Sequence, residues 1–341
     1  MKISRINLGM LTVALAALMT ACNEDDNYTA GETNKPGTDI TALDGKVTAL
    51  QTATKGNGIN IILMGDGFTS ADITDGTYDH VMETTAEGLF SIQPMKGLRE
   101  YFNVYVVQKV SVSSAMDGQT ALGSMTDGDI IHGKPTYTAM DGKTLLYASA
   151  VPEYNVNNTF VAVVMNSPLS GGITSYPFGW QQMACAYCTL FGGLDSDEFR
   201  QTMIHELVGH GIAKLGDEYT PRTQLTDDDL NDNYYYGQFE LRGWYENLDL
   251  YGDLTSEWCF WADLAANPRY AGEQLGMYEV TSTDTGWTLY RATENSIMRD
   301  TSSPDMTFNA PSRRAIYNKV MQIATGNTPT PGDFLEFDKG N

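Results

Sequence analysis

The sequence predicts an α/β domain with a central sheet. Short apolar runs rich in β-branched residues alternate with segments that carry helix-capping residues, which is typical of this class. The 341 residues are 42% hydrophobic and 19% charged, so the chain is long and apolar enough to form a large buried core. We see no internal repeat and nothing that resembles a linker between residues 45 and 326, so we expect one domain over residues 46–341.

Three runs predict strands. Residues 59–64 are mostly apolar and are followed by Gly65-Asp66-Gly67, which predicts a buried strand that ends in a tight turn. Residues 101–112 are rich in Val, Tyr and Phe, and residues 159–165 are mostly β-branched or aromatic. Both runs therefore predict further strands of the same sheet.

Helices are predicted between and after these strands. Residues 79–89 predict one, and a second begins near Asp195-Ser196, which offer caps before the acidic pair Asp197-Glu198. Residues 311–323 predict a last helix with proline at its start. The stretch 217–290 is rich in Tyr, Trp, Gly and Asp and gives no clear assignment.

The N-terminus has the features of a bacterial lipoprotein signal. Basic Lys2 and Arg5 precede an apolar run at 8–19 that is too short to span a bilayer. Small residues then lead into Cys22, which predicts a signal peptide at 1–21 and lipidation of Cys22. Ordinary signal cleavage nearby is the alternative.

Residues 22–45 are mostly polar and predict a flexible tether that holds the domain away from a membrane surface. Its acidic start, residues 23–27, resembles surface-export signals of some gut bacteria. We therefore expect an extracytoplasmic, outer-membrane lipoprotein that is exposed at the cell surface.

The net charge is strongly negative. Against 43 Asp and Glu the chain has 21 Lys and Arg, a formal charge of −22. Nucleic acids and anionic lipid surfaces are bound by basic patches, so neither is an expected partner. The lipid at Cys22 is then the only predicted link to a membrane. The sequence leaves the oligomeric state open, and a monomer is the expectation.

The strongest chemical signal is His205-Glu206-Leu207-Val208-Gly209-His210, which holds two of the four histidines. Zinc peptidases use two imidazoles, a third ligand and a carboxylate next to the attacking water, and His-Glu-x-x-His supplies most of these on one helix. Here the spacing is one residue longer, which separates the two rings by about 140° on an ideal α-helix. A π-bulge, made easier by Gly209 and Gly211, would realign them.

Two families share parts of this pattern. The His-Glu-x-x-x-His spacing is similar to that of the dipeptidyl peptidase III family, whose chains are far longer. The run from Gly209-His210 to Leu215-Gly216-Asp217-Glu218-Tyr219 resembles the IgA-peptidase family of zinc metallopeptidases more closely. Three further segments resemble the same family: Gly65-Asp66-Gly67-Phe68, Glu294-Asn295-Ser296-Ile297-Met298-Arg299 and Phe308-Asn309-Ala310-Pro311-Ser312-Arg313. The resemblance covers about 56–325.

The resemblance implies a zincin-like α/β fold with a central mixed sheet and an active-site helix that carries the zinc motif. It implies His205 and His210 as zinc ligands and Glu206 as the general base that deprotonates zinc-activated water. The third ligand should come from Asp217-Glu218. Asp217 is the first choice because the chain turns after Gly216, and Glu218 is the alternative or supports a ligand histidine.

Other residues have weaker signals. Met298 is either a core residue or lies in a turn beneath the zinc. Tyr219, Tyr290 and Arg299 are candidates for stabilising the oxyanion, and the sequence does not rank them. Cys185, Cys188 and Cys259 favour a disulfide or buried thiols over a structural metal site.

These observations predict a lipid-anchored zinc endopeptidase that cleaves proteins or peptides. One alternative is an inactive surface-binding protein on a peptidase scaffold, if the extra residue moves the histidines apart. Another is an exopeptidase, as the spacing of the dipeptidyl peptidase III family would suggest. A hydrolase of cell-wall peptides or another amide also remains open.

Overall fold

The structure is a computed structural model, and it describes residues 43–124, 138–178, 183–219, 243–256, 258–282, 288–303 and 305–340. All of these belong to one compact unit, Thr38–Asn341. The predicted signal peptide, the lipidation site Cys22 and most of the predicted tether lie outside the described residues.

The fold is mixed α/β around a central mixed sheet, as predicted. In the described part of the chain its strands are β1 (Val47–Gln51), β2 (Ile59–Asp66), β3 (Phe102–Val107), β4 (Thr159–Met165), β5 (Gly172–Ser175) and β6 (Cys185–Thr189). They lie in the order β1-β3-β2-β4-β6-β5. The four inner strands are parallel, whereas β1 and β5 are antiparallel to their neighbours.

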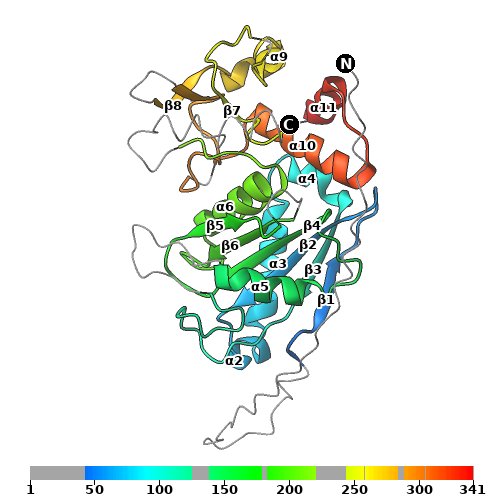
Figure 1. Ribbon diagram of the computed structural model, residues 1–341, viewed down its shortest axis with the longest axis vertical. Coiled ribbons are helices and arrows are strands. Elements are labelled where there is room, and N and C mark those ends of the chain that lie inside the picture. The colour runs from blue at the N-terminus through cyan, green and yellow to red at the C-terminus, as the bar shows by residue number, and fades with distance from the viewer. Residues whose placement is uncertain are drawn as a thin grey trace, which may run out of the picture. The chain divides into compact units, whose positions relative to one another are not determined.

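Helices cover both faces of this sheet (Figure 1). The α-helices are α2 (Ser70–Thr74), α3 (Thr77–Leu89), α4 (Met95–Leu98), α5 (Thr138–Ala148), α6 (Asp197–Met203), α9 (Ala262–Ala265), α10 (Ala310–Thr325) and α11 (Pro331–Phe337). Short 3-10 turns occupy Arg99–Tyr101, Pro268–Glu273 and Asp338–Gly340, and a π-helix occupies Ile204–Ile212.

Alternation along β2 divides the core into two layers. Ile61 and Leu63 pack in the larger layer with side chains of α3, α6, α10 and the π-helix. Ile62 and Met64 face the opposite way and pack with Ala148 of α5. The π-helix therefore lies on the sheet face opposite to α5.

The predicted strands and helices are confirmed in position. The strand predicted at 101–112 is shorter than expected, because the chain leaves the sheet after Val107. Beyond that point Ser111 N donates a hydrogen bond to Phe68 O at 2.7 Å. The helix predicted at 311–323 is α10, which has proline in its first turn as predicted and begins after an Asn309 cap. The prediction that it is the last helix was wrong, because the short α11 follows it.

A second, smaller sheet was not predicted. It consists of β7 (Leu248–Asp249), β8 (Tyr278–Ser282) and β9 (Thr288–Arg291), all antiparallel, in the order β7-β9-β8. Its strands are two to five residues long, too short to leave a clear alternating pattern in the sequence.

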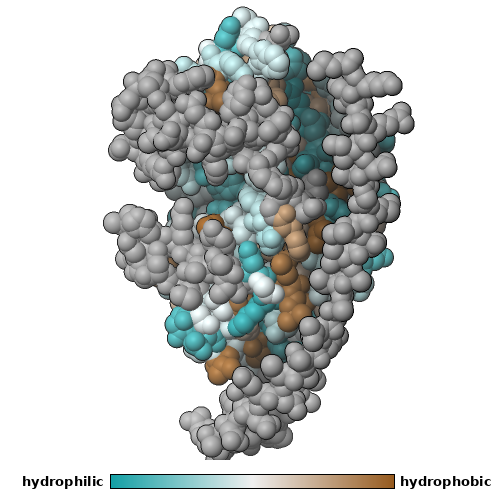
Figure 2. Space-filling view, in the orientation of Figure 1, coloured by the Kyte–Doolittle hydropathy of each residue, from teal (hydrophilic) through white to brown (hydrophobic). Residues whose placement is uncertain are grey.

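The surface mixes polar and apolar residues. Figure 2 shows hydrophobic and hydrophilic residues interspersed over the coloured part of the face in view. No helix within the described ranges is both long and apolar enough to cross a membrane.

Candidate metal centre

The helix that carries both histidines is a π-helix. It continues α6, whose first turn is capped by the Ser196 hydroxyl, and its last turn closes with Ala213 N donating to Val208 O, five residues back, at 3.0 Å. The wider turn absorbs the extra residue of the motif. The imidazoles of His205 and His210 therefore meet, with 4.6 Å between ring centroids and 87° between planes. The expected π-bulge is confirmed.

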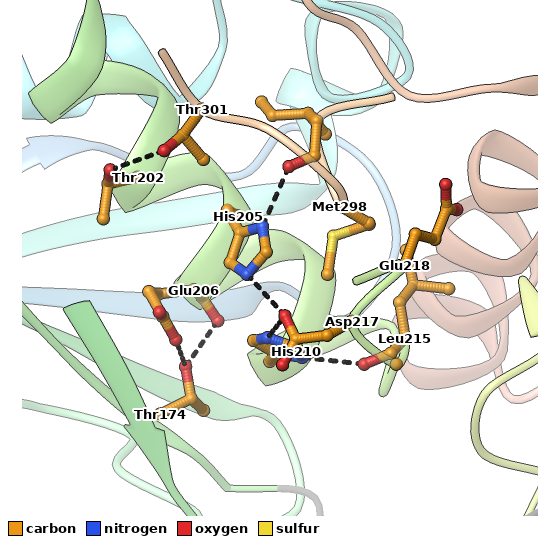
Figure 3. A network of polar contacts seen from close by, with 12 residues as sticks. Thr174, Thr202, His205, Glu206, His210, Leu215, Asp217, Glu218, Met298 and Thr301 are labelled. Carbon is orange, nitrogen blue, oxygen red and sulfur yellow. Dashed lines mark hydrogen bonds and ion pairs between the residues drawn. The ribbon is translucent and has the colours of Figure 1, made fainter. Parts of the chain in front are cut away.

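Asp217 completes a cluster of three side chains (Figure 3). Its Oδ1 lies 3.1 Å from His205 Nε2 and 3.2 Å from His210 Nε2. One ligand atom from each residue lies within 4.8 Å of the others, so the cluster can hold a metal ion.

Backbone carbonyls fix the tautomers of both imidazoles. His205 Nδ1 lies 2.9 Å from Ile297 O, and His210 Nδ1 lies 2.7 Å from Leu215 O. A carbonyl oxygen only accepts, so in each neutral imidazole Nδ1 carries the hydrogen and Nε2 keeps the lone pair that can bind a cation. Three acceptor atoms thus converge on one point, which favours a cation there.

The cluster fits a tetrahedral zinc ion. Bonds of about 2.0–2.2 Å in that geometry separate neighbouring ligands by about 3.3–3.6 Å, close to the two distances found here. Two neutral imidazoles and one carboxylate are also a ligand set that zinc accepts in catalytic sites, with a fourth position open.

Electrostatics within the cluster show the same preference for positive charge. Burial alone would lower the pKa of His210, but the Asp217 carboxylate raises it to about 9. Burial alone would raise the pKa of Asp217, but the two imidazoles hold it far below its usual range. In the metal-free protein the proton on His210 supplies the positive charge that a metal ion would otherwise bring to the cluster.

Glu206 lies next to this cluster but outside it. Its side chain is buried, and its Oε2 accepts a hydrogen bond of 2.7 Å from the Thr174 hydroxyl of β5. Figure 3 shows this carboxylate on the side of the π-helix that faces β5.

Glu218, the alternative third ligand, points away from the histidines. Its buried carboxylate accepts hydrogen bonds from Ser296 Oγ at 2.6 Å, Asn247 Nδ2 at 3.1 Å and Asn309 Nδ2 at 3.2 Å. Burial raises its pKa, and these three donors oppose that rise. Glu218 thus connects the segment that holds Asp217 to two other loops.

Met298 lies in a turn against the π-helix. It is fully buried, and a Cβ atom added to Gly209 would lie 2.3 Å from its sulfur. Met298 is therefore both a core residue and the residue beneath this part of the helix, and Gly209 permits the close approach.

Of the three candidates for stabilising an oxyanion, Tyr219 lies at the cluster. Its ring centroid is 6.5 Å from that of His205, and burial together with the Asp217 carboxylate raises its pKa, which keeps the phenol protonated. Arg299 instead donates to Asn295 Oδ1 and the Glu294 carbonyl, and Tyr290 lies in β9 against Gly252.

A comparison with protein-family models matches residues 47–234 to the IgA peptidase M64 family. This chain belongs to that family. Membership indicates a metallopeptidase, and the matched region contains the three clustered side chains and Glu206. No curated protein matches the chain.

Other residues of the family-like segments have structural contacts. Asp66, at the end of β2, accepts hydrogen bonds from Thr120 Oγ1 at 2.6 Å and from the Leu122 and Ser124 amides at 2.9 Å. It therefore organises the loop above the sheet.

The three cysteines are buried free thiols, which is one of the two expected states (Cys185, Cys188 and Cys259).

The sequence reasoning missed Thr174 and Tyr176. Their hydroxyls contact the π-helix, at Glu206 and at His210 O respectively. Thr174 lies in β5 and Tyr176 directly follows that strand, and a spacing of two residues in the sequence does not identify the element that they contact.

Proposed function

We propose that this member of the family is a zinc endopeptidase that cleaves proteins or peptides, with His205, His210 and Asp217 as the metal ligands. The convergence of these three side chains, despite the longer spacing of the motif, is the observation that carries the proposal. A bound zinc ion would supply Lewis-acid chemistry, so that water near neutral pH loses its proton to a carboxylate.

In this proposal Glu206 is the general base. Its carboxylate takes a proton from the attacking water and delivers it to the leaving amine. The hydrogen bond from Thr174 orients the carboxylate, and Tyr219 donates its phenol hydrogen to the developing oxyanion.

Cleavage within a chain is supported by the position of β5. Among the described residues β5 is the last strand of the sheet, and it lies next to Glu206. An edge strand offers its unpaired backbone groups to an extended peptide, which suits the binding of an internal segment. The inactive alternative requires diverging histidines, and the observed separation of the ring centroids, 4.6 Å, does not favour it.

The catalytic role is tested with Glu206→Gln in the zinc-loaded mature protein, with quenched fluorescent casein as substrate. We expect kcat/KM to fall by about 10²- to 10⁴-fold while zinc content stays at the wild-type level. Glu83→Gln, the same change on an exposed residue of α3, is the matched control. Equal activity of the Glu206→Gln and wild-type proteins would reject Glu206 as the base. Peptides with free and blocked N-termini separate an endopeptidase from an exopeptidase.

We further propose that the protein is attached to the outer membrane by a lipid on Cys22 and faces the outside of the cell. Cys22→Ser should then move the protein from the membrane fraction to the soluble extracytoplasmic fraction. Wild-type protein that is already soluble after cell fractionation would contradict the anchor without affecting the proposed reaction.

A further inference from the structure

Strand β5 and Tyr176, the residue that follows it, present alternate side chains to the π-helix. The Thr174 hydroxyl lies 2.8 Å from Glu206 O, and the Tyr176 hydroxyl lies 2.9 Å from His210 O. Ser175, between them, faces the other way and donates to Asp141 Oδ1 of α5 at 2.7 Å. The strand therefore contacts the helix at two backbone carbonyls that belong to the proposed base and to one proposed ligand.

The strand approaches the helix closely. A Cβ atom added to Gly172 would lie 2.6 Å from the Thr202 side chain and 2.9 Å from Glu206 Oε1. Only glycine leaves room there, so the backbone of β5 determines where the hydroxyls of Thr174 and Tyr176 lie relative to the helix.

A π-helix of this length needs support from its surroundings. Such helices are rare, and the α-helical alternative with i to i+4 bonding would separate the rings of His205 and His210 by about 140°. Hydrogen bonds that side chains donate to carbonyls of the π-helix favour the π-helical form over the α-helical form. At its C-terminal end Lys214 Nζ donates one such bond to Gly211 O at 2.7 Å.

We propose that Thr174 and Tyr176 are positioning residues that hold the π-helix in the form in which His205 and His210 converge on one metal ion. This inference rests on the proposed zinc site. Without the two hydroxyls the α-helical form becomes populated in the metal-free protein. The apparent zinc affinity then falls in proportion to the fraction of the protein that keeps the π-helical form.

Thr174 has a second role that Tyr176 lacks. Its hydroxyl has one hydrogen and two acceptors within reach, Glu206 O at 2.8 Å and Glu206 Oε2 at 2.7 Å. When the carboxyl carries the proton taken from water, it can donate to the Thr174 oxygen while the hydroxyl donates to the carbonyl. Thr174 thus stays in contact with the base through the proton transfer.

The test measures zinc affinity by competition with a chromophoric chelator, and it needs no substrate. The variants are Tyr176→Phe, Thr174→Val, both together, and Thr174→Ser, which keeps the hydroxyl. Each single loss should weaken zinc binding by about 2- to 12-fold, as the loss of one hydrogen bond would, and the double variant by about 4- to 150-fold, the product of the two. Thr174→Ser should bind zinc like the wild type.

Tyr187→Phe is the matched control. Its hydroxyl is buried and contacts Asp141 at 2.7 Å and Thr144 at 3.2 Å, so its loss should lower the melting temperature and leave zinc affinity unchanged. With casein as substrate, Thr174→Val should also lower kcat at saturating zinc, because its hydroxyl contacts the Glu206 carboxylate.

The outcomes separate this inference from the proposed function. A double variant that binds zinc as tightly as the wild type would overturn the positioning role and leave the zinc site intact. A wild-type protein that binds no zinc would overturn the proposed function and this inference together.

Discussion

The imidazole rings of His205 and His210 lie with their centroids 4.6 Å apart and their planes at 87°, although the two residues are five positions apart in the chain. In an α-helix with that spacing the two rings would point in different directions. The π-helix places both Nε2 atoms against the same oxygen of Asp217, and each ring is oriented by a backbone carbonyl. The arrangement has the properties of a metal site rather than of a packed core.

The structure separates the roles of two adjacent carboxylates. Asp217→Ala should weaken zinc binding by at least about 100-fold, because it removes a direct ligand of the proposed site. Glu218→Gln should keep zinc affinity within about tenfold but lower the free energy of unfolding by about 1–3 kcal/mol. The reason is that an amide nitrogen in place of Oε1 would face the Asn247 donor, and one in place of Oε2 would remove the acceptor of the Ser296 hydroxyl. Chelator competition and urea unfolding measure the two effects, and a reversed pattern would reject the assignment of Asp217.

Gly209 permits the contact between the π-helix and Met298. Gly209→Ala would place a Cβ atom 2.3 Å from the Met298 sulfur, so one of the two must move. We expect a loss of about 1–3 kcal/mol in unfolding free energy, as for other overpacked cores, together with weaker zinc binding.

The control is Gly142→Ala in α5, where an added Cβ would meet nothing within 4 Å. Removing glycine from an exposed position of this helix should stabilise the protein by about 0.5–1 kcal/mol. If Gly209→Ala were as stable as Gly142→Ala, the packing account of Met298 would be wrong.

Stability of the metal-free protein should fall as pH rises above neutral. The folded pKa of His210 is about 9, above the ordinary value of 6.5, so the folded state holds an extra proton between these values. Its stabilising contribution is complete below about pH 6.5 and is lost as pH rises through about 9, with a slope of at most about 1.4 kcal/mol per pH unit. Urea unfolding in EDTA should show this slope, and His210→Ala should show a smaller one.

The same proton competes with zinc. Because coordination needs a neutral imidazole, the zinc dissociation constant should fall by up to about tenfold per pH unit from pH 7 to 9. Competition titrations against a chelator of known pH dependence measure it. A dissociation constant that does not vary across this range would show that no proton is displaced from His210.

Much of the fold was predictable because each element has its own local signal. The buried strand β2 ends at Gly65-Asp66-Gly67, and α10 begins with an Asn309 cap followed by proline. Strand β5 and the sheet of β7, β8 and β9 were not predicted, since strands of two to five residues have too few positions to establish a period.

The site was predictable where it is local in sequence. The motif from His205 to Glu218 identifies the two histidines, the proposed base and the pair that contains the third clustered residue. The choice of Asp217 for that cluster, however, depends on Ser296, Asn247 and Asn309, which bind Glu218 from distant segments. The contacts of Thr174 and Tyr176 likewise depend on packing between strand and helix, which the spacing of residues does not encode.

The central claim is that His205 and His210 bind one zinc ion together. The most direct measurement is the metal content of the purified mature protein by mass spectrometry, beside His210→Ala. We predict about one zinc per chain in the wild type and a near-complete loss in the variant. A wild-type protein that holds no zinc even after incubation with it, or a variant that holds as much as the wild type, would contradict the account.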